Sequence, residues 1–190
     1  MAVGWTIDLA RCIGCHACAV ACKAENNTAP RQSPVATKEG GFPVAVNYRW
    51  VIIEEGGTYP APTRLSVTSA CNHCDEPDCL KGCPVSAISK RAGDGIVLID
   101  QEKCIGCRQC EKACPYGAPQ FNEQSQKSEK CTMCVHRIDA GLSPACADTC
   151  PTAALTYEPA FPDGSEGENA PSGFVLPALT LPKVRFTESF

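Results

Sequence analysis

The sequence predicts an α+β fold of short helices and short β-hairpins, organised by its cysteines. Sixteen of the 190 residues are cysteine, about 8%, a level at which cysteine itself can organise a fold. The 15 glycines and 16 prolines indicate that much of the backbone forms turns and loops. Aromatic residues make up only 6%, so the chain can bury a modest core. At this length we expect one domain or two small ones.

The cysteines fall into four groups of four, with none left over. Groups one and three have the spacing C-x2-C-x2-C-x3-C, group two has C-x2-C-x4-C-x3-C, and group four has C-x2-C-x11-C-x3-C. The clearest internal copies are residues 11–15 (RCIGC) and 103–107 (KCIGC). The groups are Cys12, Cys15, Cys18 and Cys22; Cys71, Cys74, Cys79 and Cys83; Cys104, Cys107, Cys110 and Cys114; and Cys131, Cys134, Cys146 and Cys150.

Short regular elements are expected between and within the groups. Strands are predicted at residues 44–53, 65–68, 95–100 and 154–157. A turn at residues 54–58, followed by two prolines, would join the first two strands as a hairpin. Short helices should begin inside each group and run past its third cysteine, as at residues 18–25. Residues 26–42 are expected to form a polar loop.

This cysteine spacing indicates cubane iron–sulfur clusters. A cubane needs four thiolates, and three of them can come from a tight loop with cysteines three residues apart. In two-cluster ferredoxins the fourth cysteine, which precedes a proline, binds the other cluster. Cys18 and Cys22 are four helical residues apart, a rise of about 6 Å, so one helix can hold corners of two neighbouring clusters. The sequence therefore predicts bacterial-ferredoxin-like modules.

Other uses of these cysteines fit the pattern less well. Zinc sites use one C-x2-C pair and a distant second pair rather than a triple repeat. Cysteines this close together cannot bridge within a loop as a disulfide scaffold would require. Residues 12–16 match the haem-attachment string C-x-x-C-H, but haem there would leave Cys18 and Cys22 without a role. His16, His73 and His136 are expected to form hydrogen bonds or lie at the surface.

The net charge of −4 argues against nucleic-acid binding, which depends on cationic contacts. Four clusters, each −2 with its thiolates, would bring the protein to about −12. Basic residues beside the cysteines either offset this charge or are solvated surface charges. They are Arg11, Lys23, Lys81, Lys103, Arg108, Lys112 and Lys130.

The sequence begins without an export signal, and no apolar stretch is long enough to span a membrane. We expect a cytoplasmic protein, or one associated with a membrane through partners, and a periplasmic one only if it is exported together with a partner. In the reducing cytoplasm, clustered cysteines favour metal binding over disulfides.

Residues 158–190 are rich in proline and are predicted to form an extended arm that contacts a partner. A disordered tail is the alternative. The arm hypothesis rests on apolar side chains that would not stay solvated. They are Phe174, Val175, Leu176, Leu179, Leu181, Val184 and Phe186.

Over residues 4–157 the chain resembles the iron–sulfur electron-transfer subunits of DMSO-reductase-type molybdenum and tungsten oxidoreductases. That family includes the small subunits of polysulfide, thiosulfate, tetrathionate and arsenate reductases. The order of the four groups, the C-x2-C-x4-C-x3-C-P of group two and the long gap in group four carry the resemblance. Local matches are residues 22–26 (CKAEN), 114–119 (CPYGAP) and 130–134 (KCTMC).

The resemblance implies four 4Fe-4S clusters. Groups one and four exchange their fourth cysteines, and so do groups two and three, so that each cluster has three ligands from one group and one from its partner group. The sets are Cys12, Cys15, Cys18 and Cys150 (set 1); Cys22, Cys131, Cys134 and Cys146 (set 2); Cys71, Cys74, Cys79 and Cys114 (set 3); and Cys83, Cys104, Cys107 and Cys110 (set 4). We therefore expect two interlocked modules with pseudo-two-fold repeats, residues 1–63 with 119–157, and residues 64–118.

The implied function is electron relay between a large molybdenum or tungsten bis-pterin catalytic subunit and a further carrier. That carrier would be a membrane quinone subunit, a ferredoxin or a flavoprotein. The chain itself would be non-catalytic, since it shows no catalytic or nucleotide-binding motif. A free-standing polyferredoxin shuttle and a ferredoxin-like subunit of a tungsten aldehyde oxidoreductase are the alternatives. An enzyme with an open iron site is a weaker one, because sixteen cysteines leave no site short of a ligand.

Overall fold

A computed structural model describes residues 2–28, 46–174 and 179–188. The helices are α1 (Ala17–Glu25), α2 (Asp78–Lys81), α3 (Gln109–Ala113), α4 (Val135–Asp139) and α5 (Ala145–Asp148). The strands are β1 (Gly4–Asp8), β2 (Arg49–Thr58), β3 (Ala61–Ala70), β4 (Ile88–Lys90), β5 (Val97–Ile99), β6 (Gln120–Asn122), β7 (Lys127–Glu129), β8 (Leu155–Glu158) and β9 (Val184–Thr187). Within these ranges no helix is long and apolar enough to cross a bilayer.

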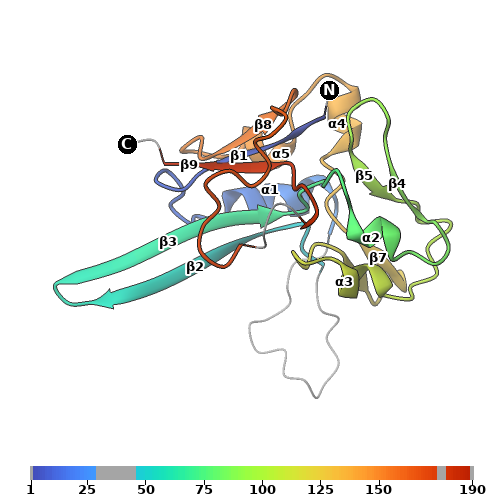
Figure 1. The fold of residues 1–190 in the computed structure, drawn as a ribbon, viewed down its shortest axis with the longest axis horizontal. Helices are drawn as coiled ribbons and strands as arrows, with labels where there is room; N and C mark the ends of the chain where they lie inside the picture. Colours follow the sequence, from blue (N-terminus) through green and yellow to red (C-terminus); the bar gives the residue numbers. More distant parts are fainter. Residues whose placement is uncertain (1, 29–45, 175–178, 189–190) are drawn as a thin grey trace, which may run out of the picture.

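A three-stranded sheet, ordered β8-β1-β9, joins the two ends of the chain (Figure 1). β8 pairs antiparallel and β9 parallel with β1, so Trp5 lies opposite both Tyr157 and Val184. The backbone of β1 is paired on both edges, and its side chains are almost all buried, including Trp5 and Ile7. The sheet thereby fixes the loop of group one, which follows β1 directly.

The remaining strands form three antiparallel hairpins: β2-β3, β4-β5 and β6-β7. The hairpin β2-β3 is much the longest and projects from the body of the molecule (Figure 1). Its base is partly buried near α1, while its outer half, residues 54–64, is exposed. β4-β5 precedes group three, and β6-β7 lies between groups three and four.

The hairpin at β2-β3 was predicted, but its bounds were wrong. The turn expected at residues 54–58 is strand, and the chain reverses at Tyr59-Pro60 instead. Ten cross-strand pairs override the local turn signal of Gly56 and Gly57. The predicted boundary between residues 63 and 64 falls inside β3, so one hairpin links both proposed modules. Residues 44–45 and most of the expected loop 26–42 lie outside the described residues.

The other short elements agree with the sequence expectations. The strands predicted at residues 95–100 and 154–157 are the shorter β5 and the shifted β8. A helix in each group contains the third cysteine, and α1 also contains the fourth cysteine of group one. The result is a mixed fold of short helices and hairpins, as predicted. The pseudo-two-fold relation between modules stays a prediction.

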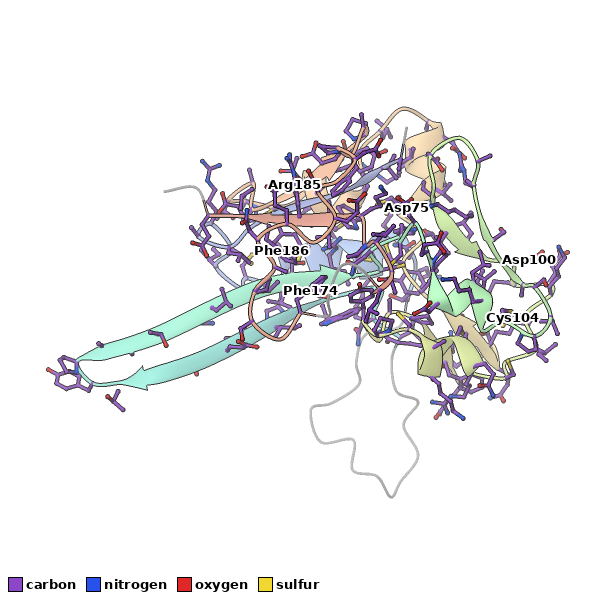
Figure 2. The ribbon with its side chains drawn as sticks, viewed as in Figure 1. Asp75, Asp100, Cys104, Phe174, Arg185 and Phe186 are labelled. Carbon is purple, nitrogen blue, oxygen red and sulfur yellow. The ribbon has the colours of Figure 1, made fainter. Side chains whose placement is uncertain are left out.

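The C-terminal arm packs on this chain's own core. This corrects the argument that its apolar side chains require a partner to cover them. Val184 and Phe186 are buried because β9 completes the sheet, and Phe161 packs against Gly4. Phe174 lies beside Phe186, with ring centroids 5.2 Å apart (Figure 2). Leu179 and Leu181 are exposed, while Val175 and Leu176 lie outside the described residues. Contact of the arm with a partner stays a prediction, but its burial needs none.

A buried ion-pair network also ties the arm to group two. The Lys183 side chain is almost fully buried, and its Nζ lies 2.5 Å from Asp75 and 2.7 Å from Glu166. The backbone N–H of Asp75 donates to the Leu181 carbonyl, and that of Lys183 to the Asn72 carbonyl. The arm therefore closes over the loop that carries Cys71 and Cys74.

We predict that Phe186→Ala destabilises the protein by about 3–5 kcal/mol, the usual cost of emptying a buried aromatic site. Thermal unfolding of the cluster-loaded protein under anaerobic conditions measures it. Tyr59→Ala, at a residue 95% exposed, is the matched control and should change little. Equal midpoints for the two variants would contradict a structural role for β9.

Candidate metal centres

Three separate cavities are each lined by four cysteine side chains. The first is lined by Cys12, Cys15, Cys18 and Cys150; the second by Cys71, Cys74, Cys79 and Cys114; the third by Cys83, Cys104, Cys107 and Cys110. These groupings coincide with ligand sets 1, 3 and 4. Each cavity thus gathers three cysteines of one group and the last cysteine of another.

The remaining four cysteines influence one another electrostatically. Burial raises the pKa of Cys22 to about 12, and the thiols of Cys146 and Cys134 add to that rise. Burial also raises the pKa of Cys131 well above its ordinary value, with contributions from Cys22, Cys71 and Cys146. The members of set 2 therefore lie near one another. Across the described part of the chain, no three His, Cys, Asp or Glu side chains are arranged to hold a single metal ion.

Left-handed backbone conformations recur in the loops between the cysteines. Gly14 and His16 in group one have φ of 68° and 63°, and Gly106 and Arg108 in group three have 69° and 61°. Further positive-φ residues are His73 in group two and Met133 and Cys134 in group four. Such turns aim successive N–H groups into a concavity that binds anions, including iron–sulfur clusters. The repeat between groups one and three is thus structural as well as sequential.

Both Ile-Gly-Cys turns require glycine, because its φ is positive and because neighbouring atoms leave no room for a Cβ. A Cβ on Gly14 would lie 2.8 Å from the Ser66 hydroxyl oxygen, and one on Gly106 would lie 2.2 Å from the Gln126 carbonyl oxygen. The loop of group three therefore lies directly against the hairpin β6-β7.

An aspartate four residues before the first cysteine shapes the entrance to both loops. The Asp8 carboxylate accepts from the backbone N–H groups of Ala10 and Arg11, at 3.0 and 3.1 Å. The Asp100 carboxylate accepts from Glu102 and Lys103, at 2.9 and 3.3 Å. In each case the next N–H, of Cys12 or Cys104, donates to the aspartate carbonyl. Asp100 and Cys104 are labelled in Figure 2. The repeated D-x3-C spacing is the sequence signal for this turn, which was not predicted.

Hydrogen bonds moderate the effect of burial on several sulfurs. Burial raises the pKa of Cys74 and of Cys79 to about 12. Burial acts the same way on Cys150, but hydrogen bonds from the Leu155 backbone and from Thr152 lower its pKa below the ordinary value. The Asn26 amide donates to the Cys22 sulfur at 3.6 Å. These donors suit a sulfur that carries negative charge.

Most basic residues expected beside the cysteines are solvated. The side chains of Arg11, Lys81, Lys103 and Arg108 are more than half exposed. Lys130 is the buried exception, and its Nζ donates to the carbonyls of Val97 and Cys131. His16 and His136 are exposed, while the buried His73 accepts a hydrogen bond from Val97 at Nδ1.

Arg49 was not predicted as a site residue, yet it is buried among the cysteines. Its guanidinium carbon lies 4.4 Å from the centroid of the Trp5 ring, and its Nη1 donates to Thr68 at 3.0 Å. Burial lowers the pKa of Arg49, but four thiols outweigh burial and raise it. They belong to Cys146, Cys131, Cys18 and Cys22. The only sequence signal for this role was the presence of an arginine inside a predicted apolar strand.

Comparison with known protein families agrees with this geometry. Residues 63–159 match the 4Fe-4S dicluster domain family, and residues 9–26 match a 4Fe-4S binding domain family. The cysteine-lined cavities and these matches define a ferredoxin-type protein that binds 4Fe-4S clusters.

Similar proteins identify the family more closely. The chain is 44% identical to the B subunit of tetrathionate reductase from Salmonella typhimurium over 144 residues, 76% of this chain and 52% of the relative. It is 41% identical to the B subunit of sulfite dehydrogenase from Allochromatium vinosum over 159 residues, 80% of this chain and 66% of the relative. It is 35% identical to the B component of anaerobic dimethyl sulfoxide reductase from Escherichia coli over 193 residues, 97% of this chain and 84% of the relative.

This protein belongs to the family of iron–sulfur electron-transfer subunits of DMSO-reductase-type molybdenum and tungsten oxidoreductases, as the resemblance implied. It spans about half the length of the tetrathionate reductase subunit and just under two thirds of the sulfite dehydrogenase subunit.

We predict that Gly106→Ala lowers both the thermal midpoint and the iron content of the purified protein. The new Cβ would force the Gln126 carbonyl to move, and a left-handed alanine costs about 1–2 kcal/mol in addition. Iron analysis and anaerobic thermal unfolding measure the two effects.

Two glycines provide matched controls for this substitution. Gly117→Ala meets no atom but shares the positive φ, so it should show the backbone cost alone. Gly93→Ala, with open space and no positive φ, should be nearly neutral. If Gly106→Ala behaved like Gly93→Ala, the tight fit of this loop would be wrong.

Proposed function

We propose that the chain relays single electrons through four 4Fe-4S clusters, between a molybdenum or tungsten bis-pterin catalytic subunit and a further carrier. The observation that carries the proposal is the gathering of twelve cysteines into three cavities lined by four cysteines each, the number of thiolates that one cubane takes. The remaining four cysteines are close enough to raise one another's pKa, which supports a fourth set. When bound, such clusters supply reversible one-electron uptake and release. The residues of sets 1 to 4 would hold them.

The cavities suit anionic clusters because they contain hydrogen-bond donors as well as cysteine sulfurs. The nests of groups one and three and the hydrogen bonds to Cys22 and Cys150 present N–H and O–H groups to sulfur. Two nitrogens of Arg49 and Nε2 of His73 are buried without a hydrogen-bond partner among the described residues. These unpartnered donors are accounted for if cluster sulfurs accept hydrogen bonds from them.

The proposed sets follow one another in the order 1, 2, 3, 4. Helix α1 carries Cys18 of set 1 and Cys22 of set 2. Cys71 of set 3 contributes to the raised pKa of Cys131 in set 2, after burial and Cys22. Helix α3 carries Cys110 of set 4 and leads directly to Cys114 of set 3. These links support a series of four neighbouring carriers.

The two outer sets reach the surface. Cys15 in set 1 and Cys107 in set 4 are exposed, and so are the neighbouring Ile13 and Ile105. All four cysteines of set 2 are buried, as are Cys71, Cys74 and Cys79 of set 3. This exposure favours electron entry and exit at sets 1 and 4. By family resemblance, set 1 would lie nearest the pterin-bound metal.

The named relatives support a subunit role over a free polyferredoxin or a tungsten aldehyde oxidoreductase subunit. Two are named as parts of reductases and one as part of a dehydrogenase. We propose a large catalytic subunit as partner, with a membrane anchor or flavoprotein as a further one, and therefore a non-catalytic role for this chain. It would lie in the cytoplasm or be held at a membrane through these partners.

The projecting hairpin β2-β3 also favours a stable partner. Two strands without a third or a packed second layer are marginally stable in water. The outer half of this hairpin is exposed and carries Tyr59, and Ile52 and Ile53 just before it are also exposed. We propose that the catalytic subunit covers it.

We predict that replacing residues 55–64 by Asn-Gly, a sequence that favours a two-residue hairpin turn, leaves the clusters in place and weakens co-purification with the catalytic subunit. Leu142→Ser, which removes an exposed apolar side chain elsewhere, is the control and should not affect assembly.

The native protein should elute with a large molybdopterin- or tungstopterin-containing subunit. Elution as a 20 kDa monomer would favour the shuttle.

We predict that Cys150→Ala disturbs the cluster of set 1 and spares that of set 2, because Cys150 lines the cavity of Cys12, Cys15 and Cys18. Cys146→Ala, only four residues earlier, should do the opposite. Electron paramagnetic resonance of the partly reduced protein distinguishes the two clusters. The reverse result would refute the exchange of fourth cysteines between groups one and four.

A further inference from the structure

Arg49 is a buried cation with unused hydrogen-bond donors. The residue begins strand β2 and is only 2% exposed. It forms no ion pair with a carboxylate of the described residues, and its Nε and Nη2 have no hydrogen-bond partner there. A buried, unpaired charge with two orphan donors is strongly unfavourable unless an anion compensates for it.

The surroundings of Arg49 indicate where that anion lies. Three of the thiols that act on its charge, those of Cys146, Cys131 and Cys22, belong to set 2. The fourth, Cys18, belongs to set 1 and is linked through Thr68, whose hydroxyl oxygen lies 3.3 Å from the Cys18 sulfur. The guanidinium therefore lies at the junction of sets 1 and 2, where three of the four thiols that act on its charge belong to set 2.

Strand β1 holds the guanidinium in place. The Trp5 ring lies under the guanidinium carbon at 4.4 Å, and the Trp5 indole N–H donates to the Cys71 carbonyl at 3.2 Å. A planar guanidinium stacks on an aromatic ring and presents several donors in a fixed fork, whereas an ammonium does neither. Arginine rather than lysine suits this position.

The other buried cations differ from Arg49 because their donors are engaged. Lys130 donates to two backbone carbonyls, and Lys183 pairs with Asp75 and Glu166. Their charges are therefore already compensated by protein oxygens.

We propose that Arg49 is the counter-cation of the cluster held by Cys22, Cys131, Cys134 and Cys146, and that its Nε and Nη2 donate to sulfur atoms of that cluster. This inference rests on the proposed function, since it requires a cluster in set 2. Reduction adds one electron to an anionic cluster, so a fixed positive charge and charge-assisted hydrogen bonds stabilise the reduced form more than the oxidised form. Arg49 thereby raises the reduction potential of the set 2 cluster above the value that this cluster would have without the arginine.

The test is a redox titration of the cluster-loaded protein, followed by electron paramagnetic resonance. The signal of set 2 is assigned as the one that Cys146→Ala changes. Arg49→Gln should make this cluster about tenfold harder to reduce, a fall of about 59 mV for a one-electron couple. Arg49→Lys keeps the charge but loses the fork, so its shift should be smaller. Arg185→Gln removes a cation that pairs with Glu158 and should shift none of the four potentials.

A spectroscopic readout keeps the inference testable even if Arg49→Gln fails to assemble. With arginine labelled by ¹⁵N, the reduced set 2 cluster of the native protein should show nitrogen modulations in electron spin echo spectra. Arg49→Lys should remove them. Absence of these modulations in the native protein, or potentials that Arg49→Gln leaves unchanged or shifts equally, would overturn the role of Arg49.

Iron analysis of the same samples separates the two levels of the account. About sixteen irons per polypeptide with unchanged potentials would refute the role of Arg49 and leave the proposed relay intact. Eight irons or fewer in the native protein would refute the proposed relay itself, and the inference with it.

Discussion

The convergence of cysteine sulfurs from distant parts of the chain is the constraint on which the other features depend. Cys150 lies beside Cys12, and Cys114 beside Cys71, although each pair is far apart in sequence. Burial raises the pKa of thiols such as those of Cys22 and Cys74 to about 12, so a bound cluster would have to displace their protons. Because each set joins distant parts of the chain, no such site exists in the unfolded chain, and cluster binding would be coupled to folding. This accounts for a fold with few aromatics and short elements.

Several further features of the structure suit the anionic clusters that we propose. Nests at Gly14 and Gly106 and aspartate turns at Asp8 and Asp100 repeat the same loop in groups one and three. The sheet β8-β1-β9 anchors the loop of group one, because β1 leads directly into that loop and β8 follows group four. Two of the three buried Lys and Arg residues in the described part of the chain, Arg49 and Lys130, are unusual because carboxylates are not their main partners. Arg49 faces thiols, and Lys130 faces backbone carbonyls.

The sequence was most informative where interactions are local. Spacing of three residues predicted the cysteine groups and their short helices, because a loop wrapping one cluster is encoded within a few residues. Family resemblance, not spacing, supplied the exchange of fourth cysteines. Long-range pairing was invisible: β9 joins β1 across most of the chain, so Val184 and Phe186 were interpreted as partner contacts. Gly56 and Gly57 suggested a turn that cross-strand pairing overrides, and Arg49 acquires its role only from cysteines distant in sequence.

The central claim is that four complete cysteine sets each hold one 4Fe-4S cluster. Native mass spectrometry of the anaerobically purified protein tests this most directly, since it weighs the polypeptide together with its bound clusters. The account predicts a main species heavier than the 190-residue polypeptide by four Fe₄S₄ units. A main species carrying two clusters, or zinc ions in their place, would contradict it.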